Sequence, residues 1–260
     1  MSRIRQAFHG HALIPFITCG DPDLETTELL VRKLAEAGAD LIELGIPFSD
    51  PTAEGPVIMS ASERALKAGT TTDRIFEMTE RLSREIQIPL VFMTYANVVY
   101  SYDSDRFLKR CAETGIDGLI LPDVPYEEME EFAPYCKKYG VDFIRMIAPT
   151  SEHRISMIAE AAEGFIYIVS SLGVTGMRSS IQTDIRPMTE VIRSVTDVPC
   201  AVGFGISDAK QAKAMASVSD GAIVGSAIVR LIGQYGKDCP EPVYEFVKEL
   251  ADAVHSLDPS

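Results

Sequence analysis

Two carboxyl side chains, Glu43 and Glu54, lie close enough along the chain to work as an acid–base pair. Glu43 stands inside the apolar run 40–46, a pattern that predicts a buried strand. Because burying an unpaired carboxylate is costly, Glu43 needs either a partner or a chemical use. The loop 47–56 that follows carries Glu54 and contains three prolines, which hold its side chains at low entropic cost. We therefore predict that Glu43 and Glu54 are catalytic residues and that 47–56 is a catalytic loop.

A plainer interpretation of the two acids stays open at this point. Glu43 could be a core acid satisfied by a neighbour, and Glu54 a solvated loop acid. We favour the catalytic interpretation because buried acids are rare and cluster at functional sites.

The composition disfavours several classes of function. The chain has 260 residues and a net charge of −14, which argues against binding to nucleic acid and to anionic membrane surfaces. No apolar run approaches the ~20 residues that span a bilayer, and the N-terminus lacks the apolar core of a signal peptide. The five cysteines are scattered, with no C-x-x-C pair, which predicts reduced thiols. We expect a cytoplasmic protein.

Apolar runs alternate with helical patterns along the whole chain. The strands are expected at 12–18, 40–46, 89–95, 118–121, 142–148, 165–170, 199–204 and 221–224. The helices are expected from a cap at Asp21 with Pro22 in the first position, and at 56–68, 73–84, 104–114, 126–139, 151–162, 185–195, 208–217, from Ser226, and at 241–256. Residues 95–97 are expected to begin a loop. Eight strand–helix units in a chain of this length predict a single (β/α)8 barrel over 1–260.

The rival fold is an open, doubly wound sheet. That fold would want a Gly-x-Gly-x-x-Gly turn after its first strand, and Cys19-Gly-Asp-Pro22 does not match it. One segment departs from the alternating pattern: 171–183 is small and polar, without a period. We predict that 171–183 is a mobile active-site lid loop.

Barrel enzymes place their chemistry at the C-terminal ends of the strands. We expect polar groups there and no comparable set at the N-terminal ends. The turns at Gly203-Phe-Gly205 and Gly225-Ser226 would form a phosphate cradle, because glycines let backbone amides approach an anion and a helix N-terminus favours negative charge. The alternative is that these are ordinary turn glycines.

Missing residue types narrow the chemistry further. No lysine falls in an expected strand, so a Schiff-base aldolase is disfavoured. No histidine falls at a strand end, so we expect no metal site, although the carboxylates of Asp50 and Glu54 could in principle hold Mg²⁺. What remains is a metal-free reaction of carboxyl groups on a phosphorylated substrate. The expected active site has an apolar lining, which suggests that this substrate is bulky and flat. The lining comprises Phe16, Met93, Ile120, Tyr167, Phe204 and Ile223.

In these motifs the chain resembles the α subunit of tryptophan synthase, over essentially its full length. The resemblance rests on motifs that each stand at an expected strand end: Pro15-Phe-Ile-Thr-Cys-Gly-Asp-Pro22, Glu43-Leu-Gly-Ile-Pro-Phe-Ser-Asp-Pro51, Tyr95-Ala-Asn97, Asp123-Val-Pro125, Gly173-Val-Thr-Gly176, Gly203-Phe-Gly-Ile-Ser207 and Gly225-Ser-Ala-Ile-Val229.

The resemblance implies cofactor-free, retro-aldol cleavage of indole-3-glycerol phosphate to indole and glyceraldehyde 3-phosphate. Glu43 would act as acid and then as base, and Glu54 would accept a hydrogen bond from the indole N–H. Tyr167 would contact the substrate near Glu43, and Thr175 would close over the site. The indole would be sandwiched by Phe16, Met93, Ile120, Phe204 and Ile223. The phosphate would be held by Gly176, Gly205, Gly225 and Ser226.

The resemblance also implies a partner, the β subunit of tryptophan synthase, in an α2β2 tetramer. That subunit carries pyridoxal phosphate and takes indole through a tunnel. Asp50, Asp123 and Pro125 would face it. Many members of the family have aspartate at the position of Glu54, and some have arginine at the position of Ser171. Three alternatives stay open: another phosphate-binding barrel enzyme, a non-catalytic partner subunit, and a free-standing lyase.

Overall fold

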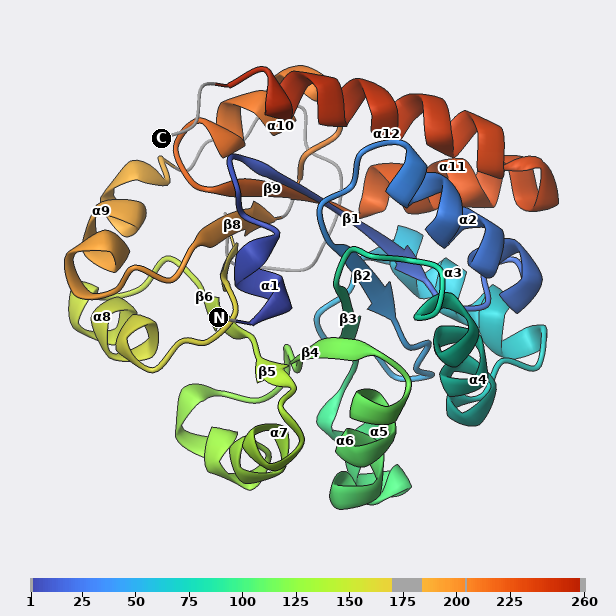
Figure 1. Cartoon of the computed structure of the whole chain (residues 1–260), viewed down its shortest axis with the longest axis horizontal. Coiled ribbons are helices and arrows are strands. Elements are labelled where there is room, and N and C mark those ends of the chain that lie inside the picture. Colours follow the sequence, from blue (N-terminus) through green and yellow to red (C-terminus); the bar gives the residue numbers. More distant parts are fainter. Residues whose placement is uncertain (1, 170–183, 204, 258–260) are drawn as a thin grey trace.

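The computed structural model describes residues 2–169, 184–203 and 205–257. These residues form parallel strand segments at β1 Ala12–Thr18, β2 Ile42–Gly45, β3 Leu90–Met93, β4 Ile116–Ile120, β5 Asp142–Phe143, β6 Arg145–Ile147, β7 Ile166–Val169, β8 Cys200–Gly203 and β9 Gly221–Val224. The strand order is β5-β4-β3-β2-β1-β9-β8-β7-β6. Figure 1 looks down the resulting barrel, with helices around the strands.

The barrel closes through a bend in one strand. The segment predicted at 142–148 is divided at Ile144, so that β5 pairs with β4 while β6 pairs with β7. The Ile144 amide still donates to the Leu119 carbonyl oxygen at 2.9 Å, which keeps the chain continuous in the sheet. The two ends of the strand order are therefore one strand. The predicted α/β barrel, with eight strands, is confirmed.

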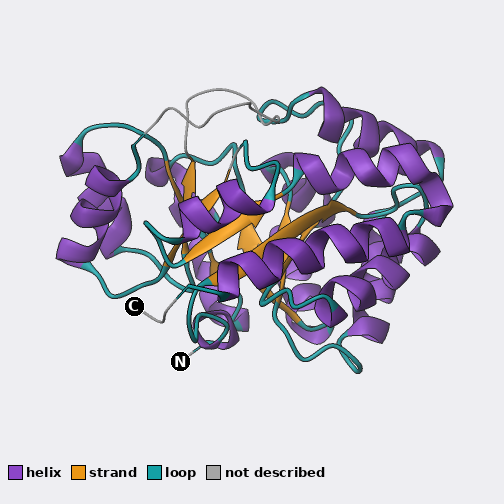
Figure 2. Ribbon diagram, turned by 90° about the horizontal axis from the view of Figure 1, so that it is seen from above, coloured by secondary structure: helices purple, strands orange, loops and turns teal. Residues whose placement is uncertain are grey.

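Helices cover the outside of the strands (Figure 2), except for α1, which lies at the N-terminal end of the barrel. The helices are α1 Arg3–Gln6, α2 Leu24–Glu36, α3 Pro56–Lys67, α4 Thr72–Leu82, α5 Ala96–Tyr102, α6 Ser104–Glu113, η1 Tyr126–Glu131, α7 Ala133–Tyr139, α8 Glu152–Glu160, α9 Arg186–Val195, α10 Ala209–Ala216, α11 Ser226–Tyr235, η2 Gly236–Asp238 and α12 Pro240–His255. Among the described residues, no helix is long and apolar enough to cross a membrane.

Several helix predictions were wrong in informative ways. The single helix expected at 126–139 is a 3₁₀ turn, η1, followed by α7, because Pro134 cannot continue a helix from the preceding turn. The loop expected from Tyr95 is instead the short helix α5, with Tyr95 as its N-cap residue. Helix α1 was not predicted at all.

Asp21 does not cap α2, contrary to the prediction. The cap is Asp23, whose carboxylate accepts from the Thr26 amide at 2.8 Å, and α2 begins at Leu24. Asp21 lies in the preceding loop, where Arg64 binds its carboxylate. The sequence offers two aspartates two residues apart, and only the tertiary partner distinguishes them.

The strands are buried on both faces, as their apolar sequences predicted. Inward-facing side chains form one cluster inside the barrel, which includes Ile14, Val91, Ile144 and Phe165. Helix α1 closes the N-terminal end of this cluster by inserting Ile4, which is fully buried. Gly118 makes room for it, since a Cβ there would lie 2.7 Å from the Ile4 Cδ1 atom.

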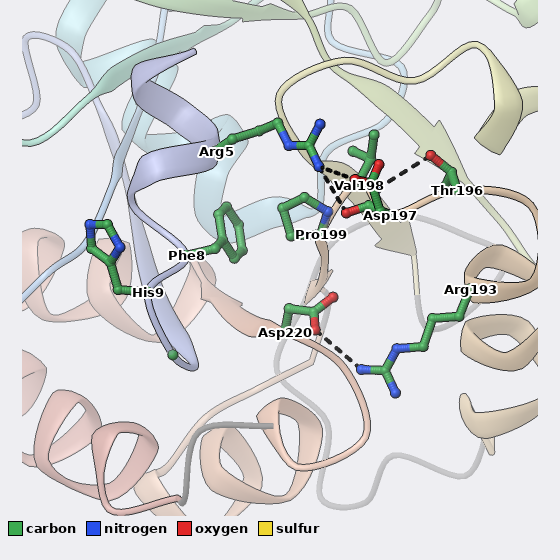
Figure 3. A pocket seen from close by; sticks show the side chains of 10 residues that line it. Arg5, Phe8, His9, Arg193, Thr196, Asp197, Val198, Pro199 and Asp220 are labelled. Carbon is green, nitrogen blue, oxygen red and sulfur yellow. Dashed lines mark hydrogen bonds and ion pairs between the residues drawn. The ribbon is translucent and has the colours of Figure 1, made fainter. Parts of the chain in front are cut away.

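The N-terminal end of the barrel carries more polar groups than we expected. Arg5 pairs with Asp197 at 3.1 Å and Arg193 pairs with Asp220 at 3.2 Å, on the walls of a hollow of about 380 Å³ (Figure 3). Because each of these guanidinium groups already has a carboxylate, the hollow presents no unbalanced charge for a ligand. These ion pairs hold the base of the barrel together.

Candidate active site

Glu43 lies at an inward-facing position in the middle of β2. Its register partners are Phe16 on β1 and Val91 on β3. The residue is 1% exposed, and neither carboxyl oxygen has a hydrogen-bond partner among the described residues. Burial raises the pKa of Glu43 to about 8. The group is therefore mostly protonated at neutral pH and is suited to donating a proton to a bound substrate.

Tyr167 faces the same space from β7, on the far side of the barrel. It is buried in the inward-facing cluster, and its pKa is well above the ordinary value because of burial and the negative charge of Glu43. Gly203 on β8 makes room for its ring, since a Cβ there would lie 2.6 Å from the Tyr167 Cε1 atom. The Tyr167 phenol therefore faces the barrel interior within the electrostatic influence of the Glu43 carboxyl group.

Apolar side chains complete the wall around these two residues. Ile120 and Ile223 belong to the inward-facing cluster, Met93 packs against it, and Phe16 lies beside Met93 in a neighbouring cluster. The Phe16 ring lies over Gly45, where a Cβ would come within 2.6 Å of the ring. These apolar side chains thus place the Glu43 carboxyl group in a low-dielectric environment inside the barrel.

Glu54 lies in the loop between β2 and α3, half-buried. Burial raises its pKa to about 7, although a hydrogen bond from the Tyr95 phenol works in the opposite direction. The Oε2 atom has no hydrogen-bond partner in the described part of the chain. Glu54 therefore ionises near neutral pH, and its pKa of about 7 lies below the pKa of about 8 for Glu43.

Tyr95 holds the loop that carries Glu54. Its hydroxyl oxygen accepts from the Ala53 amide at 3.1 Å, and its ring packs on Phe48 with centroids 5.2 Å apart. The tyrosine is itself fixed at the start of α5, where both carboxylate oxygens of Asp123 accept from the Ala96 amide at 3.1 Å. Tyr95 stands in one of the strand-end motifs of the sequence, but no role was predicted for it.

The ends of β8 and β9 form the glycine turns expected for a phosphate. Gly205 has a φ of +82°, a conformation that favours glycine. Gly225 is the N-cap residue of α11, which has no side-chain cap and no acidic residue in its first turn. The N-terminal amides of α11, which begins at Ser226, can therefore receive an anion.

The comparisons with known proteins agree with this geometry. A family model described as tryptophan synthase alpha chain matches residues 3–255. The tryptophan synthase alpha chain of Lacticaseibacillus casei is 47% identical over 255 residues, covering 98% of this chain and 96% of that protein. The chain belongs to the tryptophan synthase alpha chain family. As a member, it is a lyase that cleaves indole-3-glycerol phosphate in tryptophan biosynthesis.

Solved structures of tryptophan synthase share the fold. A crystal structure of the tryptophan synthase alpha chain from Legionella pneumophila superposes with a TM-score of 0.88 at 32% identity, covering 99% of this chain and 98% of that chain. A structure of the tryptophan synthase α2β2 complex from Pyrococcus furiosus gives a TM-score of 0.84 at 32% identity, covering 94% and 98%.

The structure brings most of the predicted site residues of this alpha chain to one end of the barrel. Thr175, Gly176 and Phe204, with the predicted lid 171–183, lie outside the described residues. Within the described ranges, no group of three His, Cys, Asp or Glu side chains could hold a metal ion.

Two inward-facing residues escaped the prediction. Met146 on β6 packs against the barrel interior, and Val169 at the end of β7 belongs to it. Both line a cavity of about 510 Å³ that also reaches Asp123 and Pro125. The signal for Met146 was present, since it stands two residues after the inward Ile144, but the bend in the strand obscured the alternation.

Tyr95→Phe is expected to shift the acidic limb of the pH–rate profile upwards. The phenol hydrogen bond favours the ionised form of Glu54, so its loss raises the pKa of that carboxyl from about 7. The profile of kcat/KM for indole release measures the shift. Tyr100→Phe is the matched control, because Tyr100 lies on the same helix, 49% exposed, against Phe132. An unchanged acidic limb in Tyr95→Phe would exclude this role.

Proposed function

We propose that this chain cleaves indole-3-glycerol phosphate with Glu43 as the acid–base catalyst and Glu54 as its electrostatic partner. One observation supports this assignment above the others. Glu43 is a carboxyl group buried inside the barrel mouth, without a hydrogen-bond partner in the described residues and with a pKa of about 8. A group in that state is costly to keep for structure alone.

The protons balance if Glu43 works twice. The protonated carboxyl group first donates to C3 of the indole, which converts that carbon into a leaving group. The resulting carboxylate then takes the proton from the glyceryl hydroxyl beside the bond. That hydroxyl becomes the aldehyde, the carbon–carbon bond breaks, and its electron pair restores the aromatic ring. Glu43 ends the cycle protonated, as it began.

Glu54 acts in its ionised form. Protonation of C3 places positive charge on the indole nitrogen, and a carboxylate that accepts the N–H hydrogen bond stabilises it. Phe16, Met93, Ile120 and Ile223 would enclose the indole, with Phe204 by the resemblance, while Tyr167 contacts the substrate beside Glu43. Gly205, Gly225 and Ser226 would hold the phosphate, with Gly176 and Thr175 assigned to the substrate by the resemblance alone.

We further propose that indole passes to a β subunit in an α2β2 tetramer. The complex from Pyrococcus furiosus is such an assembly, and the pyridoxal phosphate would belong to the β subunit, with no cofactor or metal in this chain. Asp50, Asp123 and Pro125 are exposed and are assigned to the interface. The cavity that reaches Asp123 and Pro125 also reaches the inward Met146, which gives indole a direction of exit.

We also propose a cytoplasmic location. All five cysteines are unpaired, buried thiols, which suits a reducing compartment.

Indole release from indole-3-glycerol phosphate by the purified chain, without and with a β subunit, tests the proposal. Weak release that rises sharply with the partner supports the alpha-chain role. Strong release by the chain alone would favour a free-standing lyase. No release in either mixture would contradict the proposed mechanism.

A further inference from the structure

An ion pair between a buried aspartate and a partly exposed arginine connects the β1 end of the barrel to helix α3. Asp21, in the loop after β1, is 1% exposed. Its carboxylate is bound by two guanidinium nitrogens of Arg64 on α3, Nε and Nη2. The Nε–Oδ1 distance is 2.7 Å and the Nη2–Oδ2 distance is 2.8 Å. A planar, bidentate pair of this kind fixes orientation as well as distance. Neither residue has a place in the mechanism described above.

Helix α3 is the element that continues the Glu54 loop. Its N-cap is Gly55, directly after Glu54, so the helix axis determines where that loop ends. Ile58 and Ala61 on the same helix pack with Phe16 and with Val229 of α11. Helix α3 therefore contacts two parts of the proposed site. One is Phe16, in the apolar wall proposed to enclose the indole (the indole wall). The other is α11, whose N-terminus is proposed to hold the phosphate (the phosphate helix).

Two further contacts make the ion pair part of a tight joint. The Arg64 guanidinium covers Gly233 of α11, where a Cβ would lie 3.0 Å from the Nη2 atom. At the C-terminal end of α3, the Thr70 side chain fills the space beside Gly20, which has a φ of +86°. Loop 19–23, α3 and α11 therefore meet around Arg64 and Thr70.

We propose that the Asp21–Arg64 pair is a positioning clamp for catalysis, which sets the place of the Glu54 carboxyl group relative to the indole wall and the phosphate helix. The proposal rests on the proposed role of Glu54. Arg64 does not touch the substrate; it acts through α3. A displacement of about 1 Å at a catalytic group can cost on the order of 10²-fold in rate. Loss of the clamp is therefore expected to lower kcat.

Arg64→Lys is the sharpest test, because lysine keeps the charge and loses the bidentate fork. We expect kcat for indole release to fall by about tenfold or more, with KM changed by less. The acidic limb of the pH–rate profile should move to lower pH, since a loosened loop admits water to Glu54 and its pKa falls towards the ordinary value.

Arg3→Lys is the matched control at the opposite end of the barrel. Arg3 also pairs with an aspartate, on the closed face, but through a single nitrogen: its Nη1 atom lies 2.9 Å from both carboxylate oxygens of Asp117, while Nη2 donates to the Gln87 carbonyl oxygen. A purely structural role for Arg64 predicts that both variants melt lower and that neither changes kcat or the pH profile. That result would overturn the proposal.

The Glu54→Ala background separates the clamp from the role of Glu54 itself. If Arg64 acts through Glu54, adding Arg64→Lys to Glu54→Ala should change kcat little, and a full, additive loss would contradict the clamp. If Glu54→Ala alone turned over normally, the proposed function of Glu54 would fail instead. Should Arg64→Lys not fold, Asp21→Asn carries the same expectations, because Arg64 is 39% exposed and can be solvated.

Discussion

Glu43→Gln is expected to lower kcat for indole release by about 10³-fold or more, because glutamine can neither donate the proton to C3 nor accept one from the hydroxyl. The amide matches the carboxyl in shape and enters a site where Glu43 has no hydrogen-bond partner among the described residues. The fold should therefore be kept. Single-turnover indole formation, with circular dichroism of the same sample, measures both quantities. Full activity in Glu43→Gln would exclude the acid–base role.

The same substitution is expected to stabilise the protein at alkaline pH. The folded pKa of Glu43 is about 8, above the value of 4.5 for a solvated glutamate, so the folded state binds the proton more tightly than the unfolded state. Stability is therefore complete below about pH 4.5 and falls as the pH rises towards 8. The cost at neutral pH is on the order of 3 kcal/mol, and glutamine removes it.

Melting temperatures at two pH values test this linkage. Glu43→Gln should melt several degrees above the wild type at pH 8, with little difference at pH 4. A lower melting temperature for the variant at pH 8 would mean that the ionised carboxylate is satisfied in the native state. Gain of stability with loss of rate is the pattern of a residue kept for chemistry.

The architecture was predictable because the strands are buried on both faces. Runs such as 12–18 and 221–224 match β1 and β9 residue for residue, since an apolar run bounded by turn residues has few other places in a barrel. Of the residues predicted at strand ends, Tyr167 and Ile223 lie in the same inward-facing cluster. Periodicity and position predicted the strands, but they did not identify Met146 and Val169, which also face the barrel interior.

Features that depend on a distant partner could not be predicted. Helix α5 begins at Ala96 because Asp123, 27 residues later, caps its first amide. Asp21 leaves the cap of α2 because Arg64, 43 residues away, binds it. The polar base of the barrel follows from α1, whose four residues are too short for a periodic signal. In the first two cases a tertiary contact overrides a local preference, and in the third the helix is too short to give a pattern.

Glu54→Ala is expected to reduce kcat by about 10²- to 10³-fold, the usual effect of removing one group that stabilises transition-state charge. Its pKa of about 7 and the pKa of about 8 for Glu43 predict a narrow, bell-shaped pH–rate profile in the wild type. The alanine variant should lose the acidic limb, which reports Glu54, and keep the alkaline limb, which reports Glu43.

Glu54→Asp separates the charge of this residue from its reach. Aspartate keeps the carboxylate but ends one methylene earlier, while Tyr95 and the Ala53 amide hold the loop for the longer side chain. We expect a loss of about tenfold, much smaller than for alanine, because part of the shortfall is recovered by loop adjustment. The acidic limb should survive, at a lower pH, because the ordinary pKa of aspartate lies below that of glutamate. An alanine variant that matched the wild type, or an aspartate variant as slow as alanine, would show that charge at this position is not what the reaction uses.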